Sequence, residues 1–272
     1  MSETLRVLIL AVVQGIAEFL PISSSGHLVI FNEVLKRLQG GEVADEGMTL
    51  NIVLHVGTLG SILVVYFRRL QRILIEMDWR LCSAIILASV PAAIVGIGFK
   101  DRLEPLFASP AVAGFGLLIT AFLLILGQRL KSGEWTDRKL PWPVALVVGC
   151  FQAVALVPGI SRSGSTISGG ILSGMERESS ATFSFLIAIP AIGGAAALDL
   201  LKFLKPGSTE TVSLPIPTLL MGLVVSFIVG IFALRMLIQF ISRQRLHWFG
   251  YYCLVMGILV LTWQAIEGNL AR

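Results

Sequence analysis

The chain has 272 residues, of which 55% are hydrophobic and only 14% are charged, and its mean hydropathy is +0.85. A soluble globular domain carries about 25% charged residues, so this composition excludes an ordinary soluble domain. The formal net charge of +4 comes without an aromatic-laced basic surface, which argues against nucleic acid as a partner. The composition therefore predicts a protein that resides in a lipid bilayer.

Apolar segments follow one another along the chain. The first, residues 11–29, is interrupted by Pro21 and a run of serines, and the later segment 146–172 is interrupted in a similar way. A helix crosses the hydrocarbon core with about 20 apolar residues, and it satisfies its own backbone hydrogen bonds there. The uninterrupted segments near this length are 50–67, 81–99, 111–127, 183–201, 217–237 and 248–266. We predict an all-α polytopic membrane protein, a single domain over residues 1–272, with about six transmembrane helices.

Lys and Arg residues predict the topology. If each uninterrupted segment crosses once, twelve basic residues fall on one side, Arg68, Arg129 and Arg243 among them. Eight fall on the other side, Lys205 and Arg272 among them. Because cytoplasmic loops carry an excess of Lys and Arg, we expect the first group in the cytoplasm and both termini outside. This alternation holds only if the two interrupted segments do not cross, so we predict that each is a re-entrant helix hairpin.

The two hairpins resemble each other in sequence. A shift of 138 residues superposes 14–26 on 152–164 with six identities in thirteen positions. The predicted topology sends the first hairpin in from outside and the second from the cytoplasm. Broken helices of inverted repeats form binding sites near the bilayer midplane. We therefore predict an inverted-topology repeat, with halves of approximately 1–130 and 140–272, whose hairpins converge on one site.

The first hairpin contains residues suited to catalysis. Gln14 and Glu18 lie four residues apart and share a helix face, and an ionisable residue inside the membrane is usually functional because it is costly. After Pro21, a new helix is expected to begin near Gly26, and a helix N-terminus favours an oxyanion. His27 can act as acid, base or nucleophile. The candidate phosphate-binding residues of this hairpin are Ser23, Ser25 and Gly26.

The second hairpin contains Arg162. A charge at this depth requires an anionic partner, and a guanidinium binds phosphate oxygens in a bidentate fork. The partner can be a phosphate, Glu18, or both together. The spacing is not that of a Walker A loop. The candidate binding residues here are Ser161, Ser163, Gly164 and Thr166. We expect His55 to be a hydrogen-bonded core residue, although it can also line the same cavity.

Two motifs point to a known family. The first is Gln14-x-x-x-Glu18 followed by P-x-S-S-S-G-H at 21–27, and the second is P-G-x-S-R-S-G-S-T at 158–166. Together they resemble the undecaprenyl-diphosphate phosphatase family linked to bacitracin resistance, and the length and hydropathy of the chain are similar throughout. The resemblance implies hydrolysis of undecaprenyl diphosphate to undecaprenyl phosphate and inorganic phosphate, which recycles the lipid carrier of cell-wall synthesis. It also implies the bacterial inner (plasma) membrane and a site facing the periplasm or outside.

The resemblance further implies a divalent cation, Mg²⁺ or Ca²⁺, held by Glu18 with help from Gln14. Gln14 stands where the family pattern also has Glu, so it would be a neutral ligand. Arg162 is expected to neutralise phosphate charge. The nucleophile is open: either Ser24 activated by His27, or His27 itself.

Other functions fit the same residues. A transporter or flippase for a polyprenyl phosphate can use an inverted-repeat anion site, but it needs no nucleophile. A purely structural membrane subunit would leave Glu18 and Arg162 without a role. The expected partners are the polyprenyl diphosphate, the bilayer and, as a possibility, a second copy of the chain.

Overall fold

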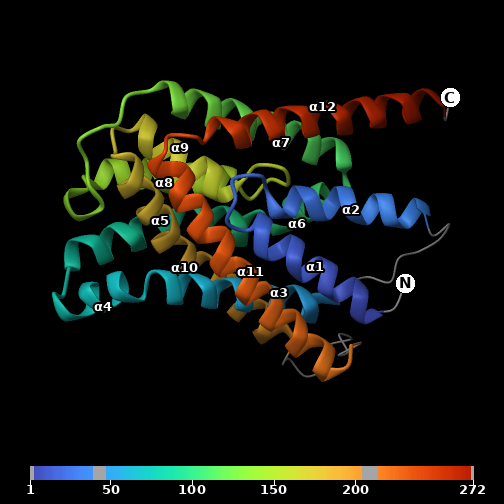
Figure 1. The fold of residues 1–272 in the computed structure, drawn as a ribbon, viewed down its shortest axis with the longest axis horizontal. Helices are drawn as coiled ribbons and strands as arrows, with labels where there is room; N and C mark the ends of the chain where they lie inside the picture. Colours follow the sequence, from blue (N-terminus) through green and yellow to red (C-terminus); the bar gives the residue numbers. More distant parts are fainter. Residues whose placement is uncertain (1–2, 39–46, 204–213, 271–272) are drawn as a thin grey trace.

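The computed structural model describes residues 3–38, 47–203 and 214–270 (Figure 1). Two basic residues used in the topology argument, Lys205 and Arg272, lie outside them. The described residues form helices and connections, with one isolated β-bridge, so the all-α prediction is confirmed. The helices are α1 (Glu3–Ala17), α2 (Ser24–Leu38), α3 (Gly47–Val65), α4 (Phe67–Ile75), α5 (Trp79–Gly98), α6 (Lys100–Leu103), η1 (Glu104–Ala108), α7 (Pro110–Arg129), η2 (Asp137–Lys139), α8 (Trp142–Val154), α9 (Arg162–Leu172), α10 (Arg177–Phe203), α11 (Ile216–Ser242) and α12 (His247–Leu270).

Five of these helices are long and apolar enough to cross a membrane, namely α5, α7, α10, α11 and α12. Helix α3 continues into α4 with a bend of 68°, and counting this pair as one span raises the number to six. Five of the six predicted segments match α5, α7, α10, α11 and α12, and segment 50–67 covers most of α3 and reaches the first residue of α4. Large apolar side chains on them, such as Phe115, Phe122 and Phe232, are exposed, which suits a surface that faces lipid. The prediction of a polytopic protein with about six transmembrane helices is therefore confirmed.

The two interrupted segments form helix hairpins. Helices α1 and α8 have 15 and 13 residues, which is short of the roughly 20 needed to cross. Figure 1 shows the α1–α2 hairpin entering from one end of the molecule and the α8–α9 hairpin from the opposite end, with their tips meeting in the middle. Helix α1 packs against α11, and α8 packs against α5. Each hairpin therefore lies against a helix from the other half of the chain.

Basic connections gather at one end of the molecule. Helix α4, the α7–α8 connection and the α11–α12 connection lie toward the same end in Figure 1. Arg68 lies in α4, Arg129 is the last residue of α7, and Arg243 lies in the α11–α12 connection. The opposite end receives the α1–α2 hairpin. This arrangement matches the grouping of basic residues that the sequence suggested.

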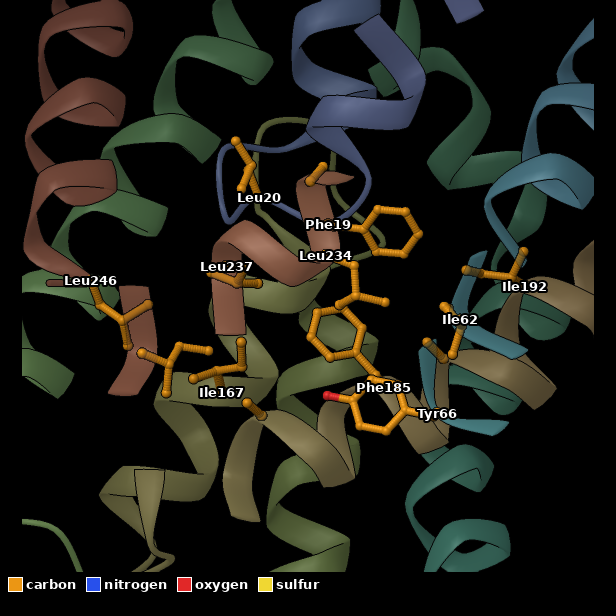
Figure 2. Packing of buried hydrophobic residues seen from close by; sticks show 14 of the residues in the cluster. Phe19, Leu20, Ile62, Tyr66, Ile167, Phe185, Ile192, Leu234, Leu237 and Leu246 are labelled. Atoms are coloured by element: carbon orange, nitrogen blue, oxygen red, sulfur yellow. The ribbon is translucent and has the colours of Figure 1, made fainter. Parts of the chain in front are cut away.

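The largest apolar cluster joins the hairpin tips to the spanning helices (Figure 2). Phe19, from the tip of the first hairpin, and Phe185, from α10, are fully buried with ring centroids 6.0 Å apart. Ile167 from α9 and Ile62 from α3 are also fully buried in it. Complete burial of such a side chain contributes roughly 1.5–3 kcal/mol. The cluster therefore holds both tips on the same apolar support.

Close backbone contact at the second tip gives a prediction. Gly159 has φ +88°, and a Cβ there would lie 2.0 Å from the carbonyl oxygen of Ala113. We expect Gly159→Ala to destabilise the protein by about 2 kcal/mol or more, because the left-handed backbone and the overpacking both cost energy. The measurement is the unfolding midpoint in detergent. Gly194→Ala in α10 is the control, since its Cβ would meet nothing within 4 Å; an equal loss in both variants would contradict the prediction.

Candidate active site

The two hairpin tips lie in direct contact. A Cβ on Gly26 would lie 2.7 Å from the Cα of Gly159, and a Cβ on Gly164 would lie 3.2 Å from the Cβ of Pro21. Side chains at these glycines would separate the tips. The glycines in the two motifs therefore permit the convergence that the sequence repeat predicts.

Equivalent serines immediately precede α2 and α9, the second helix of each hairpin. Ser23 Oγ accepts a hydrogen bond from the Gly26 amide at 3.2 Å, and Ser161 Oγ accepts one from the Gly164 amide at 3.1 Å. Serine is a preferred residue at this capping position. A second pair of hydroxyl contacts also matches, at 3.3 and 3.2 Å, between Ser23 and Ser25 and between Ser161 and Ser163. Each tip therefore presents a capped helix N-terminus, whose remaining free amides favour an anion.

The backbone at the first tip is strained. Ser23 has φ +71°, a left-handed conformation that a non-glycine residue rarely adopts. Its counterpart Ser161 has φ −69°. Such strain costs about 1 kcal/mol or more and persists where surrounding contacts enforce it, often at active sites. Here the left-handed conformation of Ser23 forms the turn that places the next residue, Ser24, beside Glu18.

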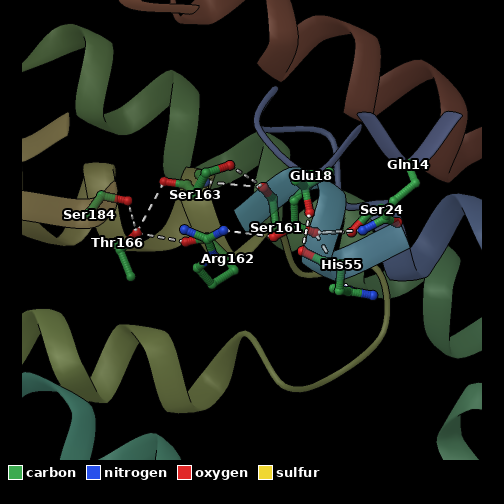
Figure 3. Close-up of polar contacts among 11 residues, drawn as sticks. Gln14, Glu18, Ser24, His55, Ser161, Arg162, Ser163, Thr166 and Ser184 are labelled. Atoms are coloured by element: carbon green, nitrogen blue, oxygen red, sulfur yellow. Dashed lines mark hydrogen bonds and ion pairs between the residues drawn. The ribbon is translucent and has the colours of Figure 1, made fainter. Parts of the chain in front are cut away.

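Glu18 is the centre of the polar contacts at the tips (Figure 3). Its Oε1 accepts from Arg162 Nη2 at 2.7 Å, and its Oε2 accepts from Ser24 Oγ at 3.0 Å. Gln14 Nε2 donates to the same Oε2 at 3.2 Å. Only 8% of the Glu18 side chain is exposed. One carboxylate therefore joins a hydroxyl of the first hairpin to the guanidinium of the second.

Arg162 retains binding capacity beyond this ion pair. Its Nη1 is buried and has no hydrogen-bond partner among the described residues. Its guanidinium carbon lies 5.9 Å from the ring centroid of Phe185, a cation–π distance. Because Nη2 binds Glu18 while Nη1 is unpartnered, the guanidinium can hold the carboxylate and a phosphate oxygen together.

His27 contacts neither Glu18 nor Ser24 through a ring nitrogen. Its Nδ1 lies 2.8 Å from the carbonyl oxygen of Ser23, and its Nε2 lies 2.7 Å from the hydroxyl of Tyr252. Both nitrogens are therefore engaged, and the Ser24 hydroxyl bonds to Glu18 instead. This geometry favours Glu18 over His27 as the partner of Ser24.

His55 belongs to the site, and the expectation of a core histidine is wrong. Its Nε2 lies 3.9 Å from Glu18 Oε2, and its side chain is 30% exposed. Its Nδ1 lies 2.9 Å from the carbonyl oxygen of Asn51. The polar residues Asn51, His55 and Thr58 are spaced four and three apart in α3, as residues on one helix face are. That spacing is the sequence signal that could have placed His55 here.

Other predicted binding residues support the second tip from within. Ser163 and Thr166 are buried, and Thr166 Oγ1 lies 2.5 Å from the hydroxyl of Ser184. Thr120 on α7 accepts from the Ser161 amide and donates to the Gly159 carbonyl, both at 2.9 Å. No motif in the sequence identified Thr120, since a lone Thr in an apolar helix is common. These buried side chains therefore position the backbone around Arg162, and their hydroxyls bond to the protein itself.

Oxygen ligands for a divalent cation are present but few. Gln14 Oε1 is buried without a hydrogen-bond partner in the described part of the chain, and it adjoins the Glu18 carboxylate. The described residues contain no group of three or more His, Cys, Asp or Glu that could hold a metal. Mg²⁺ is commonly bound by one or two protein ligands together with substrate phosphates and water. Glu18 and Gln14 fit that limited arrangement.

The buried ion pair gives a prediction about stability. Glu18→Gln should lower the free energy of unfolding by about 3 kcal/mol, because it leaves Arg162 charged and uncompensated. Glu18→Gln combined with Arg162→Met should recover most of that loss, although not the activity. Chemical unfolding in detergent measures both. If the double variant shows the sum of two separate losses, the two side chains are not energetically coupled.

Comparison with known proteins identifies the family of the chain. The profile of the family described as bacitracin resistance protein BacA matches residues 7–259. A protein of Rhodopirellula baltica named undecaprenyl-diphosphatase is 48% identical over 261 residues, which cover 96% of this chain and 98% of that protein. Proteins of the same name from Carboxydothermus hydrogenoformans and Halothermothrix orenii are 37% and 36% identical, with 97% and 95% of this chain and 98% and 97% of those proteins covered. The chain therefore belongs to the BacA family of bacitracin resistance proteins.

Proposed function

We propose that the two hairpin tips form the active site at which this chain hydrolyses undecaprenyl diphosphate to undecaprenyl phosphate and inorganic phosphate. The main observation in support is that Ser24 and Arg162 both donate hydrogen bonds to the carboxylate of Glu18, inside a membrane protein. It combines a nucleophile, a proton acceptor and an anion-binding group within hydrogen-bond distance. Family membership and the names of the relatives agree with this reaction.

The diphosphate binds between the tips. Arg162 Nη1 is available to a phosphate oxygen, and the helix N-termini that begin at Ser24 and Arg162 direct free amides at it. The polyprenyl tail remains among the apolar side chains and the bilayer. Electrostatic stabilisation of this kind is strong in a water-poor site, where charges are less screened.

The chemical step uses Ser24 as the nucleophile. Its Oγ attacks the terminal phosphorus while its proton passes to Glu18 Oε2, which lies 3.0 Å away. The bond from that phosphorus to the bridging oxygen breaks, and undecaprenyl phosphate leaves with the proton that Glu18 returns to its bridging oxygen. A water molecule then attacks the phosphoserine and gives a proton to the regenerated Glu18 carboxylate, which passes it to Ser24 Oγ as inorganic phosphate is released. Arg162 stabilises the charge on the transferred phosphoryl group in both steps.

A divalent cation would be held by Glu18 and Gln14 Oε1 together with substrate oxygens. It would supply Lewis-acid neutralisation of the phosphate charge. The protein's own contribution is to orient the two oxygen ligands from one helix face, four residues apart.

We further propose that the chain resides in the bacterial plasma membrane with the active site facing outward. The gathering of basic connections at one end supports this orientation, since that end is then cytoplasmic (Figure 1). Self-association into a homodimer stays a prediction, which light scattering of the detergent-purified protein checks.

The transporter alternative receives no support from the site. A carrier needs an anion-binding group such as Arg162 but has no use for a hydroxyl bonded to a carboxylate. The Ser24–Glu18 hydrogen bond is what distinguishes a phosphatase from a carrier.

Phosphate release from undecaprenyl diphosphate by the purified protein tests the activity. We expect release that stops with EDTA and returns with Mg²⁺ or Ca²⁺. Arg162→Ala should lower kcat/KM by about 100-fold, the scale of losing one oxyanion stabiliser. Arg243→Ala, an exposed residue at the end of α11, is the matched control and should be unaffected. No release under any metal condition would favour the carrier, and a wild-type rate in Arg162→Ala would reject its role.

Rapid acid quench identifies the nucleophile. With ³²P in the terminal phosphate, we expect an acid-stable, alkali-labile label on the peptide that contains Ser24. Ser24→Ala should abolish this label, while Ser25→Ala should keep it on Ser24. An acid-labile label on His27 would show instead that the histidine is the nucleophile.

A further inference from the structure

His27 is bound at both of its ring nitrogens. A backbone carbonyl can only accept a hydrogen bond, so the contact of 2.8 Å with the Ser23 carbonyl requires that Nδ1 carry the proton. In the neutral ring, Nε2 is then an acceptor. The Tyr252 hydroxyl, 2.7 Å away, must therefore donate to Nε2. The two contacts together select one tautomer of the imidazole.

Tyr252 also constrains the plane of the ring. The His27 and Tyr252 rings are nearly parallel, with an interplanar angle of 10° and centroids 5.6 Å apart. Tyr252 lies 225 residues further along the chain, in the first half of α12. A stacked ring and a hydrogen bond from the same side chain oppose both tilting and rotation of the imidazole.

Helix α12 is a firm support for this contact. The next residue, Cys253, is fully buried, and its Sγ lies 3.6 Å from the carbonyl oxygen of Pro21 in the first tip. Helix α12 also packs closely on α7, since a Cβ on Gly257 would lie 2.9 Å from the Gly114 carbonyl oxygen. Two successive residues of α12 therefore hold the first tip.

We propose that Tyr252 is the positioning residue for His27, holding it as the Nδ1–H tautomer in a fixed orientation beside the diphosphate site. The kinetic part of this proposal rests on the proposed function, in which His27 performs no proton transfer and acts by leaving Ser24 bonded to Glu18. Without the hydroxyl, the ring can rotate and populate both tautomers. The proposal also accounts for the hydrogen bond of Ser24 to Glu18, because His27 is held toward α12.

Tyr252→Phe removes the hydroxyl and keeps the stacked ring. The side chain is 40% exposed and borders an open groove of about 850 Å³ between the first tip, α11 and α12, so the change creates no buried cavity. We expect kcat to fall about tenfold, the scale of one lost hydrogen bond, with KM unchanged. Tyr251→Phe is the matched control: Tyr251 is 50% exposed and contacts the rings of His247 and Trp248, and its loss should leave both constants unchanged.

¹⁵N NMR of histidine-labelled protein measures the tautomer of His27. If Tyr252 had only a structural role, its substitution would leave that tautomer unchanged. The chain has three histidines, so single His→Gln variants assign the signals. We expect the Nδ1–H tautomer of His27 in the wild type and in Tyr251→Phe, and a mixture of tautomers in Tyr252→Phe.

Two results would overturn the proposal. One is an Nε2–H tautomer of His27 in the wild-type protein, which requires no variant to fold. The other is a Tyr252→Phe protein with the wild-type tautomer and the wild-type kcat. A wild-type protein that releases no phosphate would refute the proposed function instead, while its NMR spectrum would still report on the Tyr252 contact.

Discussion

The ion pair between Glu18 and Arg162 links two hairpins that enter from opposite ends of the molecule. Each charge alone would be costly at this depth, so each depends on the other in the absence of substrate. The pair also sets the chemistry, because the same carboxylate accepts the Ser24 hydrogen bond and the same guanidinium retains an unpartnered nitrogen. The Glu18–Arg162 contact therefore contributes both to the stability of the tips and to the binding of a phosphate.

Two similar hairpins have acquired different tasks around that contact. The shared serines still cap α2 and α9 with matching hydrogen bonds. Their differences lie at the polar residues of the candidate site: Leu156 and Ser165 occupy the positions equivalent to Glu18 and His27, and Arg162 stands where the first hairpin has Ser24. The repeated part provides two helix N-termini that favour an anion. The diverged part places Ser24 and Glu18 on one hairpin and Arg162 on the other.

Close packing around the hairpin tips fixes the geometry of these contacts. Glycines at the tips allow backbone to approach backbone, and the apolar cluster around Phe19 and Phe185 holds both tips from below. Thr120 fixes the second tip to α7, and Tyr252 with Cys253 fixes the first tip to α12. Since α7 and α12 pack on each other, the two tips share one frame. Preorganisation of this kind is the main protein contribution to phosphoryl transfer.

The sequence by itself determined the all-α membrane class, the six spanning segments, the two broken segments and the residues Glu18, Ser24 and Arg162. These follow from local composition and from the cost of charge in a bilayer, which are properties of short stretches of chain. Only the tertiary structure decided which groups meet: Ser24 with Glu18, His27 with Tyr252, and His55 with the site rather than the core. Such pairings join residues that are far apart in the chain, or they depend on a local backbone angle such as the φ of Ser23. They depend on how helices pack, which no single segment specifies.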